Sequence, residues 1–587
     1  IDTATISIFV LIAASAGSQT PIVTASRYSS YSDPYPAGHH FNGHCDWFCN
    51  ASFALCDRSP PGSQVSHVAL SRPREMIDYQ ILFPFLIFLP ALLGFVGCVI
   101  PKITFPFSVL MLLGYALGSF SYIGSNTSYL YTLVGEGGIQ FSVDSYSFPL
   151  IFGSCITLLI VFGLFFKKFT HYYYQICLVL LSALLISFTT VDLVSMFISL
   201  ELLGFSAFLL IADRNDRKSL FNAFQYLIGG GLAMLIYLIG VVQAFTFTGS
   251  FLLEDLVKAP ETALCLIVAG LLTKSGVFLC GMWVPNIYSH ANSQSSAVLA
   301  GCVTCAGIAP IARMSQILNP ISDSMIVIGV ISAVIAAIYA VFERDSGRAL
   351  GWSSVSQLGI AILSPTYACS YAMQHGICKA LLFSTLYSST VDGSSDSANI
   401  NIKNDINSKL SVTNEFLRVV VFIIASLSIM GFPFLAGFIT KNWIKYDIPY
   451  EAKIIYTTAA LLTSTVYARL IFDRIKNFIR QPYARSIMTL SRASKNISDL
   501  FSSSQNYILL FSIISLIVAS TAAPALFTFS AVQSAIVSAI LGGILFVSVV
   551  GIQADEFVKP VTRTLDLVGA PFLVAALLLA NLIYLKI

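Results

Sequence analysis

Five ionisable side chains lie within segments of this chain that are otherwise apolar enough to cross a membrane. They are Glu201, Lys274, His375, Lys379 and Lys441. A charge at bilayer depth costs about 2.5–3.5 kcal/mol on insertion scales, so such residues usually mark an ion or proton route. Their types and their order indicate an ion-translocating membrane protein.

The first two of these residues carry opposite charges. Glu201 is a carboxylate in the middle of the segment MFISLELLGFSAFLLI, where its charge could bias a nearby lysine. Lys274 precedes the small-residue stretch SGVF, which can break or bend a helix. A buried lysine is unfavourable unless it pairs with an acid or releases its proton, and that property makes it a usable proton carrier. The alternative for Glu201 is a polar residue that a neighbouring helix satisfies.

The other three residues could form a second group. His375 and Lys379 are four residues apart, so they share one face of a helix. Histidine changes its charge near neutral pH, which suits a His–Lys pair to a proton relay. Lys441 follows Pro433, whose missing amide can interrupt a helix and expose carbonyl groups to a water-filled cavity. The alternatives are a polar helix start for the pair and a lysine that extends to the membrane surface for Lys441.

The composition defines the elements that must position these residues. Of the 587 residues, 56% are hydrophobic and only 10% are charged, and the mean hydropathy is +0.80. Stretches of about 20 apolar residues, enough to cross a bilayer, recur from Tyr79 onward. They must be helices because lipid offers no partners for an open backbone, and the alternation of barrel strands is absent. The sequence therefore predicts an all-α polytopic membrane protein.

The apolar segments number about 16 at the length that a bilayer requires. They are residues 79–100, 105–124, 145–166, 171–190, 191–211, 218–246, 261–285, 294–316, 322–342, 348–365, 369–390, 415–440, 453–473, 505–528, 533–552 and 569–586.

Lysine and arginine concentrate in the connections that follow odd-numbered segments. They are Lys102, Lys167, Lys168, Arg214, Arg217, Lys218, Arg344, Arg348, Lys403, Lys409, Arg474, Lys476, Arg480, Arg485, Lys559 and Arg563. Positive loops stay on the cytoplasm-like side of a membrane, so both termini are predicted on the opposite, outer side.

The first 77 residues differ from the rest, being rich in Ser, Pro, Tyr and His after a short apolar run at 6–17. That run is too short to span a bilayer comfortably and is similar to the apolar core of a signal peptide. We expect a processed targeting or extension segment on the outer side, with an unprocessed structural arm as the alternative.

Three cysteines lie close together within this extension. Because the extension should face an oxidising compartment, we expect one disulfide among Cys45, Cys49 and Cys56. The alternative is a zinc site formed by His40 and His44 with the first two of these cysteines, although their spacing is irregular. The other nine cysteines lie singly in apolar segments and are predicted to be small core residues.

Six motifs surround the charged residues in a fixed order. They are SLELLGFSAFLLI (199–211), DRKSLFNAFQYLIGG (216–230), LLTKSGVFLCGMWVPNIY (271–288), RALGWSSVSQLG (348–359), HGICKALLF (375–383) and GFPFLAGFITKNWI (431–444). Together they resemble the antiporter-like membrane subunits. That superfamily includes subunits 2, 4 and 5 of complex I (NADH:quinone oxidoreductase) and the A and D subunits of Mrp-type Na⁺/H⁺ antiporters.

The resemblance implies about 14 core transmembrane helices with two inverted repeats, each containing a broken helix, a plan common among transporters. It implies an N-terminal extension at 1–77, an antiporter-like core at 78–528 and about two additional C-terminal helices at 529–587. It also implies that Glu201 and Lys274 pair in one half-channel. His375 and Lys379 would then lead to Lys441 in the other.

The function implied is proton translocation as a subunit of a complex I-type enzyme, with an Mrp-type antiporter subunit, a divergent non-conducting scaffold or a stand-alone transporter as alternatives. The chain has no Rossmann, Walker or iron–sulfur signature, so we expect no cofactor in it. FMN, iron–sulfur clusters and quinone are expected in partner subunits. Other membrane subunits and lipids are the expected partners, and nucleic acid is not. The expected location is the mitochondrial inner membrane, with the thylakoid or bacterial plasma membrane as alternatives.

Several positions depart from the family pattern. Leu279 replaces a proline, Gln225 replaces a lysine common in several members, and Tyr371 replaces a histidine that some subunits carry. Segment eight has no charge before its terminal arginine, and Cys305 falls about where Mrp D-type members place a lysine. A relay across the middle would then need water or hydroxyl bridges, such as that of Thr304.

Overall fold

The structure is a computed structural model that describes residues 75–123, 128–133, 139–166, 171–213, 216–278, 280–386, 405–480 and 528–549. The chain divides into a small unit, residues 1–81 with 133–138, and a large unit, residues 82–132 with 139–587. Nearly all of the described residues belong to the large unit, which carries all five predicted relay residues.

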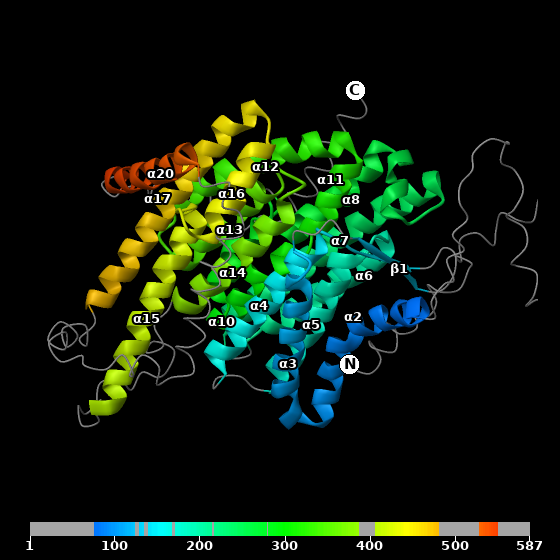
Figure 1. Ribbon diagram of the computed structural model, residues 1–587, viewed down its shortest axis with the longest axis horizontal. Coiled ribbons are helices and arrows are strands. Elements are labelled where there is room, and N and C mark those ends of the chain that lie inside the picture. The colour runs from blue at the N-terminus through cyan, green and yellow to red at the C-terminus, as the bar shows by residue number, and fades with distance from the viewer. Residues whose placement is uncertain are drawn as a thin grey trace, which may run out of the picture. The chain divides into compact units, whose positions relative to one another are not determined.

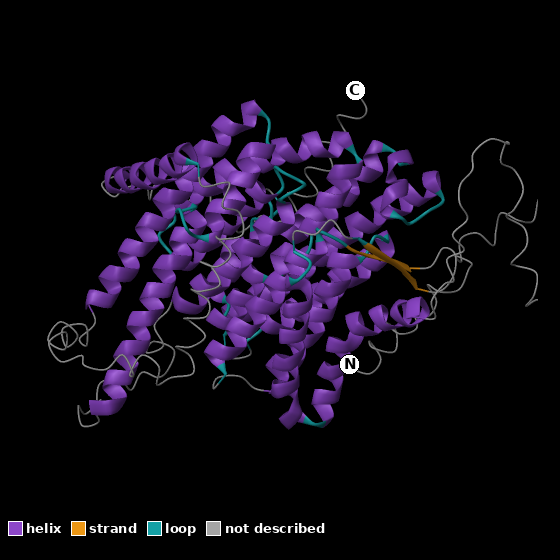
Figure 2. Cartoon of the chain, in the orientation of Figure 1, coloured by secondary structure: helices purple, strands orange, loops and turns teal. Residues whose placement is uncertain are grey.

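Helices make up almost all of the described chain (Figures 1 and 2), so the predicted all-α polytopic fold is confirmed. The uninterrupted helices are α2 (Glu75–Val99), α3 (Pro101–Phe120), α4 (Ser147–Phe165), α5 (His171–Thr189), α6 (Leu193–Ile211), α7 (Arg217–Thr248), α12 (Asn319–Phe342), α13 (Ser346–Ala361), α14 (Ala368–Leu386), α17 (Tyr450–Arg480) and α20 (Phe529–Val549). Seven helical stretches among the described residues are long and apolar enough to cross a membrane.

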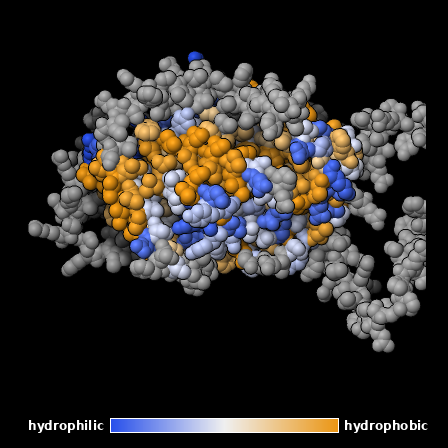
Figure 3. Space-filling model, turned by 90° about the horizontal axis from the view of Figure 1, so that it is seen from above, coloured by the Kyte–Doolittle hydropathy of each residue, from blue (hydrophilic) through white to orange (hydrophobic). Residues whose placement is uncertain are grey.

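The surface agrees with a lipid environment. Figure 3 shows apolar side chains gathered in a continuous area on one face, beside a separate hydrophilic area. Helix α7 carries such exposed apolar side chains, with Phe221, Ile228 and Ile239 each at least 60% exposed. Large exposed apolar side chains in such numbers are unusual for a soluble monomer and indicate a protein that lies in the membrane.

The two predicted breaks are confirmed. Residues predicted as one segment at 261–285 form α8 (Glu261–Ser275) and α9 (Trp283–His290). Helix α8 ends because Gly276 adopts a positive φ of 67°, which glycine tolerates best. Residues 415–440 likewise form part of α15 (Asp405–Met430) and α16 (Ala436–Asp447), with Gly431 at φ 85° between them.

A third break was not predicted. The segment predicted at 294–316 consists of α10 (Ser293–Gly301), the short 3₁₀ helix η2 (Val303–Cys305) and α11 (Ile308–Ile317). A Cβ atom on Gly307 would lie 2.2 Å from Oγ of Ser275, so this break packs tightly against the end of α8. Two interrupted helices therefore meet beside Lys274.

The hairpin of β1 (Tyr129–Leu133) and β2 (Ile139–Val143) is a second unpredicted feature. Just after β2, the carboxylate of Asp144 accepts two hydrogen bonds from Arg313 of α11, at 3.0 and 2.9 Å. The same guanidinium donates to Oγ of Ser147 and to the carbonyl of Phe188. Arg313 therefore joins α4, α5 and α11 at one end of the bundle.

The end of α17 corrects one prediction. The segment was expected to stop at residue 473, with Arg474, Lys476 and Arg480 in a loop, but α17 continues to Arg480. Arg474 is buried and donates to Glu415 of α15 at 2.6 Å, and that pairing explains how the helix carries an internal arginine. The predicted segment 533–552 corresponds to α20, whereas segments 505–528 and 569–586 lie outside the described residues, apart from Thr528. The three domain boundaries stay predictions.

Candidate functional site

Glu201 and Lys274 come together as predicted. Glu201 lies in the middle of α6 and Lys274 in the last turn of α8, and Nζ of Lys274 is 3.7 Å from Oε1 of Glu201. The lysine side chain is 5% exposed and the glutamate 30%. The ion pair therefore lies next to the first helix break, with its cation buried.

Two glycines make room for the ammonium group. A Cβ atom on Gly204 of α6 would lie 2.8 Å from Nζ of Lys274, and one on Gly230 of α7 would lie 3.3 Å away. A side chain at either position would occupy the space of the ammonium or press on it. The end of Lys274 thus lies in a slot between α6 and α7. The slot is open because the two glycines have no side chains.

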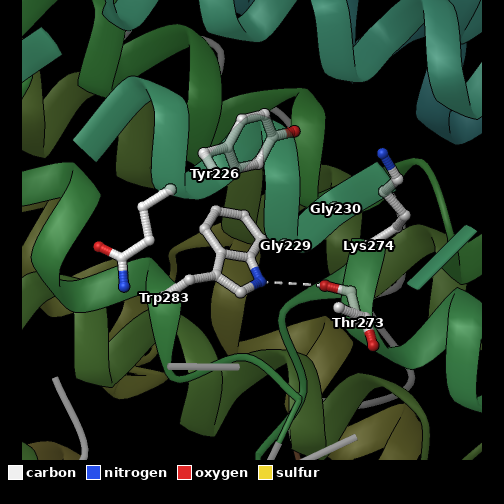
Figure 4. A pocket seen from close by; sticks show the side chains of 7 residues that line it. Tyr226, Gly229, Gly230, Thr273, Lys274 and Trp283 are labelled. Atoms are coloured by element: carbon white, nitrogen blue, oxygen red, sulfur yellow. Dashed lines mark hydrogen bonds between the residues drawn. The ribbon is translucent and has the colours of Figure 1, made fainter. Parts of the chain in front are cut away.

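A small cavity adjoins this slot (Figure 4). Its volume is about 10 Å³, room for about one water molecule, and Gln225, Tyr226, Gly229, Gly230, Thr273, Lys274 and Trp283 line it. The indole nitrogen of Trp283 donates to the carbonyl of Thr273 at 3.1 Å, so α9 is tied back to the end of α8 across the break. Gln225, which replaces the family's lysine, therefore lines the same cavity as Lys274.

The second group lies on α14. His375 is 1% exposed and Lys379 is fully buried. Nζ of Lys379 donates to the carbonyl of Leu350 in α13 at 2.7 Å and lies 5.5 Å from the centre of the Tyr467 ring. Neither ring nitrogen of His375 has a hydrogen-bond partner among the described residues. A buried histidine without such partners has two ring nitrogens that could each form a hydrogen bond with a water molecule that carries a proton.

Lys441 lies at the second helix break. It is in α16, is 8% exposed, and its Nζ donates to the carbonyl of Met430, the last residue of α15, at 3.4 Å. The break therefore supplies the lysine with a carbonyl acceptor. The exposure of carbonyl groups to a water-filled cavity by Pro433 stays a prediction. The side chain points to the interior and does not extend to the surface.

Polar side chains that the sequence analysis missed surround this second group. Gln374 donates to Ser428 at 3.2 Å and accepts from Thr440, one residue before Lys441, at 3.5 Å. Two further polar groups lie on α13 and its neighbours. In one, Tyr371 donates to Gln357, which donates to Thr463, so a tyrosine takes part where some family members have histidine. In the other, Ser353 and Tyr467 share a hydrogen bond. The signal in the sequence was the i, i+4 spacing of Ser353 and Gln357 on one face of α13.

The two groups are not directly joined. Within the described residues, no hydrogen bond or ion pair links Lys274 to His375 or Lys379. Thr304, the predicted bridge, donates to the carbonyl of Ala300 on its own segment at 3.5 Å. The backbones do meet, since a Cβ atom on Gly376 would lie 2.4 Å from the carbonyl oxygen of Gly301.

The cysteine predictions separate into two parts. The nine cysteines among the described residues are all free. Seven of them are buried, as predicted, but Cys98 and Cys265 are exposed, so the prediction of nine core residues is wrong for these two. Cys45, Cys49 and Cys56, and the zinc alternative with His40 and His44, lie outside the described residues.

Comparisons with known proteins come from sequence and from structure. The family model described as "NADH:quinone oxidoreductase/Mrp antiporter, TM" matches residues 190–466, which include the five residues predicted to form a relay. NADH-quinone oxidoreductase subunit N of Desulforudis audaxviator (strain MP104C) is 27% identical over 342 residues, covering 54% of this chain and 67% of that protein. The chloroplastic NAD(P)H-quinone oxidoreductase subunit 5 of Tecoma stans is 30% identical over 311 residues, covering 46% and 40%. The chain therefore spans about two thirds of one relative and less than half of the other.

Two solved structures share the fold. One is the membrane-bound sulfane sulfur reductase, an archaeal respiratory membrane complex, with a TM-score of 0.61 over 80% of this chain and 99% of the matched chain. The other is the Mrp complex from Dietzia sp. DQ12-45-1b, with a TM-score of 0.58 over 84% and 99%. Both are 17% identical in sequence, so they show similarity of fold alone.

Proposed function

Since this chain belongs to the antiporter-like superfamily of membrane subunits, we propose that it is a proton-translocating subunit of a complex I-type NADH:quinone oxidoreductase. The observation that carries the proposal is the ion pair of Glu201 with Lys274 at a broken helix. A lysine with a carboxylate partner, a slot to move in and a cavity for water has what reversible protonation requires.

In the first half of the route, Glu201 stabilises the protonated ammonium of Lys274 while the two side chains are close. When they separate, the ammonium loses its counter-charge in a buried site, and its proton moves on. The end of α8 at Gly276, next to the lysine, is where such a separation would take place. Coupling energy would reach the site as movement of helices, because the redox cofactors are proposed to lie in other subunits.

In the second half, the proton passes through His375 and Lys379 to Lys441. The amide and hydroxyl groups of Gln374, Ser428 and Thr440 lie beside this path. Between the halves, where no charged side chain bridges, water next to the contact of Gly301 with Gly376 would carry the proton. Lys441 delivers it to the outer side, where both chain termini are proposed to lie.

The partners proposed are the membrane subunits of the same complex, with FMN, iron–sulfur clusters and quinone held by other subunits. The proposed location is the mitochondrial inner membrane. A subunit of an Mrp-type Na⁺/H⁺ antiporter is the second candidate, because the description of the matching family model names both kinds of protein. A non-conducting scaffold is the third, favoured by the missing charge between the two halves.

The relay is tested by Glu201→Gln and Lys274→Met in the assembled complex. Each should lower NADH-driven proton uptake into vesicles by about tenfold or more, because each removes one charge of the pair. The matched controls are Glu254→Gln and Lys258→Met, since both residues are exposed and a surface ion pair such as that of Lys258 contributes little. The controls should pump normally, and native gels should show full assembly of all four variants.

Two outcomes separate the candidates. Normal pumping in both relay variants would contradict the role of the ion pair. Mass spectrometry of the natively purified protein tests the partners. Co-purifying flavin and iron–sulfur subunits support a complex I-type pump, and small Mrp-type subunits without redox proteins support an antiporter.

A further inference from the structure

A second, larger cavity opens at the start of α7, away from the proton route. Its volume is about 320 Å³, at the lower end of the range for small-molecule sites. The residues that line it are Arg217, Lys218, Phe221 and Asn222 of α7 with Asn286 and His290 of α9. Two cations, one histidine and two amides make this lining suited to an anion, and no carboxylate belongs to it.

The cations of this pocket are available to a ligand. Within the part of the chain that the structure describes, neither Arg217 nor Lys218 forms an ion pair. The nearest acid in sequence, Asp216, uses its two oxygens to cap α7, accepting from the backbone amides of Lys218 and Ser219. Its charge is thus directed at the helix end and not at the two basic side chains.

The floor of the pocket is fixed. Asn286 donates to Asn222 at 3.5 Å and accepts from Arg348 of α13 at 3.0 Å. Arg348 is also paired with Glu343 at 3.0 Å. Three helices therefore hold the amide groups in place, and a ligand would meet a preformed site.

An exposed apolar stripe continues from the mouth of the pocket along α7. Its members, spaced three or four residues apart, are Phe221, Phe224, Ile228, Leu232, Leu235, Ile239 and Val242, each at least 40% exposed. At 1.5 Å per residue, the stripe is about 32 Å long, close to the thickness of the hydrocarbon layer of a bilayer. Phe221 belongs to both features, so the pocket and the stripe are continuous.

We propose that this pocket binds the phosphate headgroup of an anionic phospholipid whose acyl chains lie along the α7 stripe. The positive charges of Arg217 and Lys218 favour an anion. Because the pocket is continuous with an apolar face as long as a bilayer is thick, a lipid is favoured over a free phosphate. Arg217 and Lys218 belong to the basic connections, and the leaflet on that side of a membrane attracts basic groups through its anionic lipids. The proposal does not depend on proton translocation.

The test uses the full chain in its purified complex, delipidated in detergent, with phosphatidylglycerol as the probe and phosphatidylcholine as the neutral comparison. The double variant Arg217→Gln with Lys218→Gln should bind phosphatidylglycerol about 30-fold more weakly, since each basic residue near an anionic lipid surface contributes about fivefold. The matched control is Lys476→Gln with Arg480→Gln, which removes the same two residue types from the exposed end of α17. The control should bind as the wild type does.

Three results would overturn the proposal. The first is equal loss of phosphatidylglycerol binding in both double variants, and the second is no loss in either. The third is equally tight binding of glycerol phosphate, which has no acyl chain and would indicate a free-phosphate site. A photoreactive residue at Phe221 tests the occupant in native membranes. A phospholipid adduct supports the proposal, and an adduct only to a neighbouring subunit contradicts it.

Discussion

At the scale of single residues, the Lys274 ammonium occupies space that is open only because Gly204 and Gly230 have no side chains. Gly204→Ala would place a Cβ atom 2.8 Å from Nζ, at the end of a flexible side chain that can move. The fold should survive, but the lysine should shift relative to Glu201. We expect proton uptake to fall about tenfold, because small misplacements of reacting groups have effects of that order or larger.

Gly231→Ala is the control for this prediction. Gly231 lies next to Gly230 in α7, and a Cβ atom there would meet nothing within 4 Å. Proton uptake should be unchanged and α7 slightly more stable, since alanine favours a helix over glycine by about 1 kcal/mol. Equal activity of Gly204→Ala and Gly231→Ala, measured in vesicles, would show that the slot has no role.

The sequence predicts the five charged positions and the pairing of Glu201 with Lys274, but not the partner of Lys379. The charges stand out because an apolar segment makes each one expensive, and that signal needs no structure. The carbonyl that Lys379 meets belongs to Leu350, 29 residues away on another helix. Such pairings depend on which face each helix turns toward its neighbours. That face cannot be read from segments in which apolar residues occur on all sides of the helix.

At the scale of elements, α20 crosses α17 at a glycine. A Cβ atom on Gly542 would lie 2.5 Å from Cβ of Ser464 and 2.9 Å from the backbone nitrogen of Thr465. The backbone cannot yield as a side chain can, so Gly542→Ala should push the helices apart at a cost of about 1–3 kcal/mol. Faster hydrogen exchange of the α20 amides would report the loss of docking.

The neighbouring glycine supplies the comparison. Gly543 has nothing within 4 Å of its Cβ position, so Gly543→Ala should leave the exchange of α20 unchanged or slower. If both substitutions gave the same exchange rates, the crossing would not depend on close approach at Gly542.

The elements were more predictable than their interruptions. The helices were predicted from the length of the apolar segments. The breaks at Gly276 and Pro433 were indicated by a glycine or proline close to a lysine in an apolar segment. The break between α10 and α11 has no charge to mark it, and the close packing of Gly307 against Ser275 of α8 is visible only in the structure. The hairpin of β1 and β2 was missed because its strands are short and lie in what reads as a polar loop.

At the scale of the whole molecule, the Asp144–Arg313 pair links segments 169 residues apart. Burial opposes ionisation of Asp144, but the charge and hydrogen bonds of Arg313, with those from Ser147, hold the pKa of its carboxyl below the usual range. A lowered pKa in the folded state stabilises the protein above the unfolded value of about 3.9, and this contribution is lost as the pH falls below it.

Asp144→Asn should therefore destabilise the protein at pH 7 by about 3 kcal/mol, because it leaves Arg313 buried without its counter-charge. The difference in thermal stability from the wild type should shrink as the pH falls below about 4, because the unfolded wild-type carboxyl takes up a proton there while the folded one, whose pKa is lowered, does so only at lower pH. Unfolding curves of both proteins between pH 3 and pH 7 would check this. A constant difference across that range would contradict it.

Helix α20 lies outside the residues that the family model matches, yet Ala531 packs against Phe438 and Ile439 of α16, just before Lys441. In the proposed route, α20 would therefore separate the residues next to Lys441 from the lipid. Protein walls hold a fixed shape, whereas lipid tails part and let water through. A chain that ended before α20 would leave this lysine behind a fluid wall, and the membrane would leak protons at the point where the route leads outward.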